Sequence, residues 1–247
     1  MDVYWLEQNQ ADLPAHFAWL SRSEADRFQT FHFAKRRMDW LLGRWTGKLA
    51  VATHLGLSHD DATLRDIEIV AAPSGAPEIF VSGKLLDIAV SLSHSGDAGV
   101  CALSNSGRAL GCDLEQIEPR GELFAAEYFT ADEQALVGGA ASDDERWRMV
   151  ALLWSAKESA LKALRAGLRL DTRCVRVILE PYTMGPSGTE RDWLPLRVHY
   201  TAGQLFRGWW RESGNLVQTL VGDPAPNQPI EYRVPIGEYR ASMLSAP

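Results

Sequence analysis

The chain has 247 residues, of which 46% are hydrophobic, and is therefore long enough to bury the core of one large domain or two smaller ones. Its formal net charge of −7 argues against a general nucleic-acid binder, because such proteins carry a basic surplus. No stretch is apolar over the length of a membrane span, and the N-terminal sequence MDVYWLEQNQ lacks the basic and apolar regions of a signal peptide. We therefore expect a cytoplasmic protein that binds neither nucleic acid nor membrane.

Residues 23–57 are predicted to be mainly helical, with Ser23 as a possible N-cap and apolar residues at helical spacing at Trp45, Leu49 and Ala52. The cations of this segment are Lys35, Arg36, Arg37, Arg44 and Lys48. Such a cluster is either the solvated face of a helix or, in an acidic protein, a phosphate-binding site. The sequence GRWTGK is one residue short of the P-loop spacing and follows no predicted strand, so we exclude a P-loop.

Three strands are predicted after the turn APSGAP, at residues 88–93, 99–104 and 109–115, and they read as a meander. The last strand ends in the sequence GCDLE. Because strand side chains alternate, Gly111, Asp113 and Glu115 share one face, and the two carboxylates could reach a single hard cation with open space beside Gly111. The alternative is that the two acids form the solvated face of a strand.

His94 stands at the end of the first of these strands, in a turn rich in serine and glycine. Turns of this composition expose backbone amides and suit contact with a phosphate, although a single histidine in a turn can also be incidental.

A capped helix is predicted at the sequence TADE, because Thr130 and Glu133 have the spacing of a capping box. A longer helix follows over residues 144–165 and contains the sequence WSAKESALK. Glu158 and Lys162 lie one helical turn apart on one face, with Lys157 beside them. They are either a surface ion pair or functional charges, and the apolar surroundings favour function because buried charge is costly.

Further strands are predicted at residues 174–179, 196–200 and 216–221, so that each half of the chain reads as helix followed by strands. We expect two units, residues 1–118 and 119–247, that meet near Pro119. The three cysteines, Cys101, Cys112 and Cys174, lack the spacing of a disulfide framework or a zinc site and are expected to be core residues.

The motifs SLSHSGDAGVCALS, GCDLE, FTADE and WSAKESALK resemble, in order and spacing, the 4′-phosphopantetheinyl transferases of the larger, surfactin-synthetase-activating type. The upstream sequences FHFAKRRMDWLLGR and GAP resemble the N-terminal half of that family. Two positions depart from the family pattern. Cys112 replaces a valine or isoleucine, and Ala76 stands where a lysine that contacts the coenzyme is common.

The resemblance implies an α+β fold of two similar α/β halves, related by a pseudo-twofold axis, with the active site in the cleft between them. It also implies an enzyme that transfers 4′-phosphopantetheine from coenzyme A to a serine of an acyl or peptidyl carrier protein, with adenosine 3′,5′-bisphosphate as the product. The pathways served by such carriers are fatty acid, polyketide and nonribosomal peptide synthesis.

The same resemblance assigns site residues. The metal ligands for Mg²⁺ would be Asp113, Glu115 and Glu158, and the catalytic residues would be Glu158, Lys157 and Lys162, with Glu158 as the base. The coenzyme would be bound by Arg37, Arg44, Lys48, His94, Lys157 and Lys162. The carrier protein is expected to dock near residues 121–130, with Leu123 and Phe124 as the main contacts, and the enzyme is expected to be a monomer. The alternatives are another Mg²⁺-dependent phosphotransferase and a noncatalytic protein that binds the carrier or the coenzyme.

Overall fold

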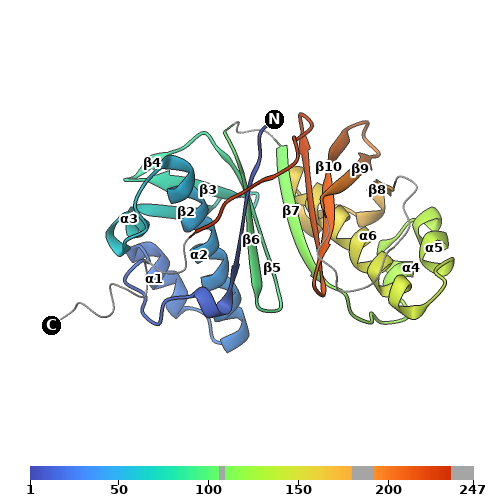
Figure 1. Cartoon of the computed structure of the whole chain (residues 1–247), viewed down its shortest axis with the longest axis horizontal. Coiled ribbons are helices and arrows are strands. Elements are labelled where there is room, and N and C mark those ends of the chain that lie inside the picture. The colour runs from blue at the N-terminus through green and yellow to red at the C-terminus, as the bar shows by residue number, and fades with distance from the viewer. Residues whose placement is uncertain (106–108, 180–191, 235–247) are drawn as a thin grey trace.

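The computed structural model describes residues 1–105, 109–179 and 192–234. Helices and sheets are mixed along the chain, so the expected α+β class is confirmed. Two sheets lie next to each other in the centre of the molecule, and the long helices α2 (Ala34–Leu55) and α6 (Asp143–Ala163) cover their outer faces (Figure 1). The order of layers across the molecule is therefore helix, sheet, sheet, helix.

The N-terminal elements form a four-stranded sheet and a smaller three-stranded sheet around α2. In the larger sheet the strand order is β12-β1-β6-β5, and in the smaller sheet it is β2-β3-β4. The bounds are β1 Tyr4–Asn9, α1 Arg22–Gln29, α3 Asp61–Asp66, β2 Ile67–Ala71, β3 Pro77–Val81, β4 Lys84–Leu85, β5 Ala89–Ser95 and β6 Ala98–Ser104.

The C-terminal elements form a five-stranded antiparallel sheet with the order β7-β11-β10-β9-β8. Strand β12 then returns to the N-terminal sheet and pairs in parallel with β1. The bounds are β7 Ala109–Gln116, α4 Phe124–Tyr128, α5 Ala131–Gly138, β8 Val175–Ile178, β9 Leu194–Tyr200, β10 Leu205–Ser213, β11 Leu216–Asp223 and β12 Ile230–Glu231.

The predicted meander is wrong, although its three strands are present. Strands β5 and β6 pair as expected, but β7 pairs with β11 in the other sheet. The reason is that both faces of β7 are covered: Leu110, Cys112 and Leu114 pack between the two sheets, and α6 packs on the opposite face. The acids of β7 therefore belong to the sheet on which α6 lies.

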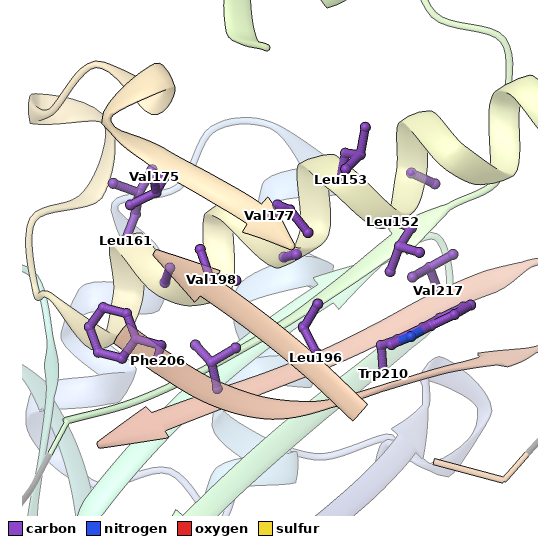
Figure 2. Close-up of a cluster of buried hydrophobic side chains, with 14 of the residues drawn as sticks. Leu152, Leu153, Leu161, Val175, Val177, Leu196, Val198, Phe206, Trp210 and Val217 are labelled. Carbon is purple, nitrogen blue, oxygen red and sulfur yellow. The ribbon is translucent and has the colours of Figure 1, made fainter. Parts of the chain in front are cut away.

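Three apolar cores hold these layers together, one under each long helix and one between the sheets. Figure 2 shows the core under α6, where Leu152 lies close to Val217 and Trp210, and Leu161 lies close to Val175. The residues drawn there include Leu152, Leu153, Leu161, Val175, Val177, Leu196, Val198, Phe206, Trp210 and Val217. Burial of this apolar surface, at about 25 cal/mol per Å², fixes α6 against the sheet.

Other expectations are refined. The helical segment is two helices, α1 and α2, and Ser21 rather than Ser23 caps the first, because the side chain of Glu24 completes a capping box with Ser21. The capping box of Thr130 and Glu133 is confirmed at α5. The sequence GRWTGK lies inside α2, as the exclusion of a P-loop requires. In the described part of the chain, none of the helices combines the length and hydropathy that a bilayer span needs.

All three cysteines have free thiols. Cys101 and Cys112 are fully buried, as expected of core residues, and Cys174 is half-buried.

Candidate active site

Gly111 allows α6 to lie directly on β7. A Cβ atom at this position would come within 1.9 Å of the carbonyl oxygen of Ser159 and 2.7 Å of the amide nitrogen of Ala163. Only glycine therefore permits this contact between helix and strand. The open space that the sequence suggested beside the two acids is thus filled by the backbone of α6, which brings Glu158 and Lys162 next to Asp113.

Asp113 is the centre of the resulting polar cluster and is buried, with an exposed fraction of 4%. Its Oδ1 accepts hydrogen bonds of 2.8 Å from the hydroxyl of Ser93 and from the ammonium of Lys162. Its Oδ2 is buried and has no hydrogen-bond partner. One carboxylate oxygen is therefore held in place while the other is free to bind a cation.

Lys162 joins strands that belong to different sheets. Besides Asp113, its ammonium donates to the carbonyl oxygen of Leu92 in β5, at 3.2 Å, and to that of Cys112 in β7, at 3.0 Å. Burial acts to lower the pKa of Lys162, but the charge of Asp113, the neighbouring Cys112, the hydrogen bond to Asp113 and the charge of Glu158 together outweigh it, so the pKa is raised. The side chain is therefore a fixed positive charge.

The other two predicted acids are electrostatically coupled to Asp113. Burial, and then the charge of Asp113, raises the pKa of Glu158 above its usual value, while Lys162 acts in the opposite direction. The same two causes raise the pKa of Glu115 to about 7, against the opposing effect of Arg120. The Oε1 atom of Glu158 is buried without a partner, whereas Glu115 accepts a hydrogen bond of 2.6 Å from Arg120. Asp113 thus disfavours the ionised form of both glutamates, an arrangement that would favour a bound cation.

The described residues contain no group of three His, Cys, Asp or Glu side chains that lie close enough together to hold a metal ion. The donor set nevertheless fits a hard cation, because Asp113 and Glu158 interact electrostatically and each has a buried carboxylate oxygen without a hydrogen-bond partner. Glu115 would have to exchange its pairing with Arg120 for the metal.

A pocket of about 410 Å³ lies beside this cluster, between the two sets of elements. One wall comes from α2, β5 and the turn at residues 72–77, and the other from Leu110 and the C-terminal end of α6. Two predicted coenzyme ligands, Arg44 and His94, line this pocket, and so does Lys162. A volume of this size is typical of a small-molecule site.

Arg37 lies outside the pocket. It is exposed, and its guanidinium stacks over the ring of Phe28, with 4.5 Å between the charge centre and the ring centroid. Two other cations of α2 lie at the pocket region. Arg44 lines the pocket itself, and Arg36 lines a second, adjoining depression together with Arg27 of α1. Arg36 and Arg44 are two helical turns apart and share a face of α2 with Trp40 between them. This spacing is the signal in the sequence that could have indicated Arg36, in place of Arg37, as a candidate coenzyme ligand.

The predicted roles of Lys48 and Lys157 are not supported by the structure, because both side chains are fully buried away from the pocket. Lys157 forms an ion pair of 2.8 Å with Glu133 and donates to the carbonyl oxygens of Thr172 and Val175. Its pKa is lowered by burial, against the opposing effect of Glu133. All the donors of this ammonium are thus engaged within the core.

Lys48 repeats this arrangement in the N-terminal elements. It pairs with Glu24 and donates to the carbonyl oxygens of Trp19 and Leu64. Burial lowers its pKa, and Glu24 opposes that shift. The sequence did not reveal these structural roles, because a buried lysine looks the same in the sequence as one that binds a ligand.

Comparison with known proteins points to one family. A family model described as the 4′-phosphopantetheinyl transferase superfamily matches residues 109–209. This match confirms, for this segment, the resemblance to the 4′-phosphopantetheinyl transferases at the level of the superfamily. It begins with β7 and includes Asp113, Glu115, Glu158 and Lys162, whereas Arg44 and His94 lie outside it.

Curated relatives match a shorter segment. Proteins named holo-[acyl-carrier-protein] synthase from Streptococcus pyogenes serotype M1 and from S. pyogenes serotype M5 (strain Manfredo) are each 37% identical to this chain over 78 residues. That segment is 32% of this chain and 65% of the length of each relative.

Proposed function

We propose that this protein transfers the 4′-phosphopantetheine moiety of coenzyme A to a serine of a carrier protein and releases adenosine 3′,5′-bisphosphate. The observation that carries the proposal is the cluster of Asp113, Glu158 and Lys162 at the edge of a pocket that both sets of elements line. Breaking a phosphate linkage requires positioned cations and one base rather than a covalent nucleophile. The names of the curated relatives are in agreement with this chemistry.

We further propose that Asp113, Glu115 and Glu158 hold Mg²⁺. Mg²⁺ prefers carboxylate oxygens and substrate phosphates as ligands, and the cluster offers free, buried carboxylate oxygens. When bound, the ion would neutralise negative charge on the pyrophosphate of coenzyme A.

Further roles in the reaction fall to a base, a fixed cation and the residues that bind the phosphates of the coenzyme. Glu158 accepts the proton of the attacking serine, because its Oε1 atom has no hydrogen-bond partner and is free to receive it. Lys162 offsets charge on the transferred and leaving phosphates, since it is held in place by Asp113 and two carbonyl oxygens. Arg44 and His94 bind the phosphates of the coenzyme from the opposite wall of the pocket.

The proposed partner is an acyl or peptidyl carrier protein that docks on α4. Leu123 has an exposed fraction of 69%, and Phe124 beside it packs on Trp154, one helical turn before Glu158. Phe129 is fully buried and belongs to the core. An amphipathic, acidic helix of the carrier would place its apolar face on Leu123 and Phe124, and the cation that faces it would be Arg120, 5.5 Å from the ring centroid of Phe124, or the exposed Arg146.

We also propose that the two halves are related by a pseudo-twofold axis. The support comes from the matched ion pairs: Glu24 and Glu133 each complete a capping box, and the same number of residues separates each from its buried lysine. Each lysine also donates to two main-chain carbonyl oxygens. The boundary at residue 118 stays a prediction, and in hydrogen bonding β7 goes with the C-terminal sheet.

The test of the proposed function is mass spectrometry of an apo carrier protein after incubation with coenzyme A, Mg²⁺ and this protein. Addition of one phosphopantetheine per carrier is the expected result. An unmodified carrier with coenzyme A bound would point to a noncatalytic binding protein. In a separate incubation that also contains ATP, consumption of ATP in place of coenzyme A would point to another phosphotransferase.

A further inference from the structure

Arg165 follows α6 directly and has a left-handed backbone conformation, with φ at 54°. Its amide donates to the carbonyl oxygen of Lys162, and the amide of Ala166 donates to that of Leu161, which together close the end of the helix. This pattern normally places glycine at the left-handed position, because a side chain there crowds the backbone. An arginine at this position is therefore unfavourable for the backbone.

Helix α2 ends in the same way but with glycine at that position. Gly56 has φ at 66°, its amide donates to the carbonyl oxygen of Thr53, and the amide of Leu57 donates to that of Ala52. Counted from the buried lysines Lys48 and Lys157, Gly56 and Arg165 occupy equivalent positions. One half thus has the residue that the backbone prefers, and the other has a cation.

The surroundings of Arg165 indicate what its side chain does. Together with Lys162 and Gly167 it forms the wall of the pocket at the end of α6. The side chain is exposed, and among the described residues no carboxylate forms an ion pair with it. An unpaired guanidinium at the wall of a pocket is suited to bind a phosphate group of a ligand.

Arg169 fixes this segment against the opposite wall. Its guanidinium donates to the carbonyl oxygen of Ser74, at 2.8 Å, and to those of Arg165 and Ala166, at 3.0 Å each. Ser74 belongs to the turn that lines the pocket next to Ala76. The two walls are therefore connected at the place where Arg165 stands.

We infer that Arg165 binds a phosphate group of coenzyme A and that Arg169 positions it, an inference that rests on the proposed function. An arginine occupies this left-handed position, in place of the glycine that the backbone favours, because its guanidinium contacts the ligand. Arg165 thus adds a cation to the pocket at a point across from Ala76, a residue that offers none.

The test compares Arg165→Gly with the wild type by thermal unfolding and by calorimetric titration with coenzyme A. Because glycine suits the backbone, we expect the unfolding midpoint to rise by about 2 °C. Because a charge-assisted contact is lost, we expect the dissociation constant for coenzyme A to rise about tenfold. The Michaelis constant for the carrier should stay within about twofold of the wild type.

Further variants separate charge from packing. Arg165→Lys should keep most of the affinity, and Arg165→Gln should lose it. Arg169→Ala should raise the Michaelis constant for coenzyme A about threefold at unchanged kcat, whereas Arg173→Ala, which removes an exposed arginine paired with Asp171, should change neither. Dephospho-coenzyme A identifies the phosphate: equal losses with both ligands assign the pyrophosphate, and a loss with coenzyme A alone assigns the 3′-phosphate.

The inference fails if Arg165→Gly and Arg165→Gln bind coenzyme A as tightly as a wild type that modifies the carrier. A wild type that binds no coenzyme A would instead refute the proposed function. The two failures are therefore distinguishable.

Discussion

The two long helices, α2 and α6, are anchored in the same way but present different residues to the pocket region. Each carries a fully buried lysine that pairs with the capping glutamate of the preceding helix, Lys48 with Glu24 and Lys157 with Glu133. Beyond that lysine the helices diverge. Where α6 has Glu158 and Lys162 and is followed by Arg165, α2 has Leu49 and Thr53 and is followed by Gly56 at the equivalent positions.

This difference distinguishes the charged residues that stabilise the fold from those that belong to the proposed site. Leu49 is a core residue, and the side chain of Thr53 forms a local hydrogen bond of 3.1 Å to the ring of His59. The buried lysines occur in both halves, which is explained by the ion pair with which each anchors its long helix. The charged residues at the other positions of this comparison occur only in the C-terminal half, so support of the fold does not explain them. They lie beside Asp113 or the pocket.

The largest expected effect follows from removing the base of α6. Glu158→Gln should lower kcat by about 10²- to 10⁴-fold at a nearly unchanged Michaelis constant for coenzyme A, because the amide cannot accept a proton. Steady-state kinetics with an apo carrier measure both constants. Asp144→Asn, which alters a largely exposed acid in the first turn of the same helix, is the control and should leave both constants unchanged. A Glu158→Gln variant that loses only affinity would make Glu158 a ligand and not the base.

The second prediction concerns the buried lysines. Lys48→Met and Lys157→Met should each lower the free energy of unfolding by about 3–5 kcal/mol, because each leaves a buried glutamate without its partner. Urea denaturation measures the loss. Similar losses would sharpen the comparison between the halves. If Lys157→Met were as stable as the wild type and yet inactive, Lys157 would be a site residue after all and the comparison would break.

The third prediction compares two arginines of α2. Arg44→Ala should raise the Michaelis constant for coenzyme A about tenfold, since Arg44 lines the pocket. Arg37→Ala should have little effect, because Arg37 is exposed and stacks on Phe28 outside the pocket. The larger loss should be specific to coenzyme A, with a smaller one for dephospho-coenzyme A if Arg44 binds the 3′-phosphate. Equal effects of both substitutions would mean that α2 acts only through its overall charge.

The smallest expected effect concerns the carrier surface. Leu123→Ser and Phe124→Ser should raise the Michaelis constant for the carrier several-fold and leave that for coenzyme A unchanged. Leu136→Ser, at an exposed leucine of α5, provides a matched control. Loss of soluble protein in Phe124→Ser, together with no effect in Leu123→Ser, would move the docking surface away from α4.

The sequence predicted local features well and long-range pairing poorly. The capping box at Thr130, the strands and the cluster of Asp113 with Glu158 and Lys162 follow from spacing and motifs, which local geometry dictates. The placement of β7 in the second sheet did not follow, because a strand that is buried on both faces carries no mark of its partner. The burial of Lys157 depends on Glu133 and two carbonyl oxygens that only the folded chain brings together.

One measurement tests directly the claim that the buried ion pair of Lys157 and Glu133 stabilises the fold and takes no part in the transfer reaction. The double variant Lys157→Met/Glu133→Gln removes the buried ion pair and keeps one side-chain oxygen, which can accept from the amide of Thr130 or from that of Val177 but not from both. Incubated with coenzyme A, Mg²⁺ and an apo carrier at a temperature where circular dichroism shows it folded, it should still add phosphopantetheine to the carrier, as mass spectrometry would detect. A folded double variant that leaves the carrier unmodified, alongside an active wild type, would contradict the account.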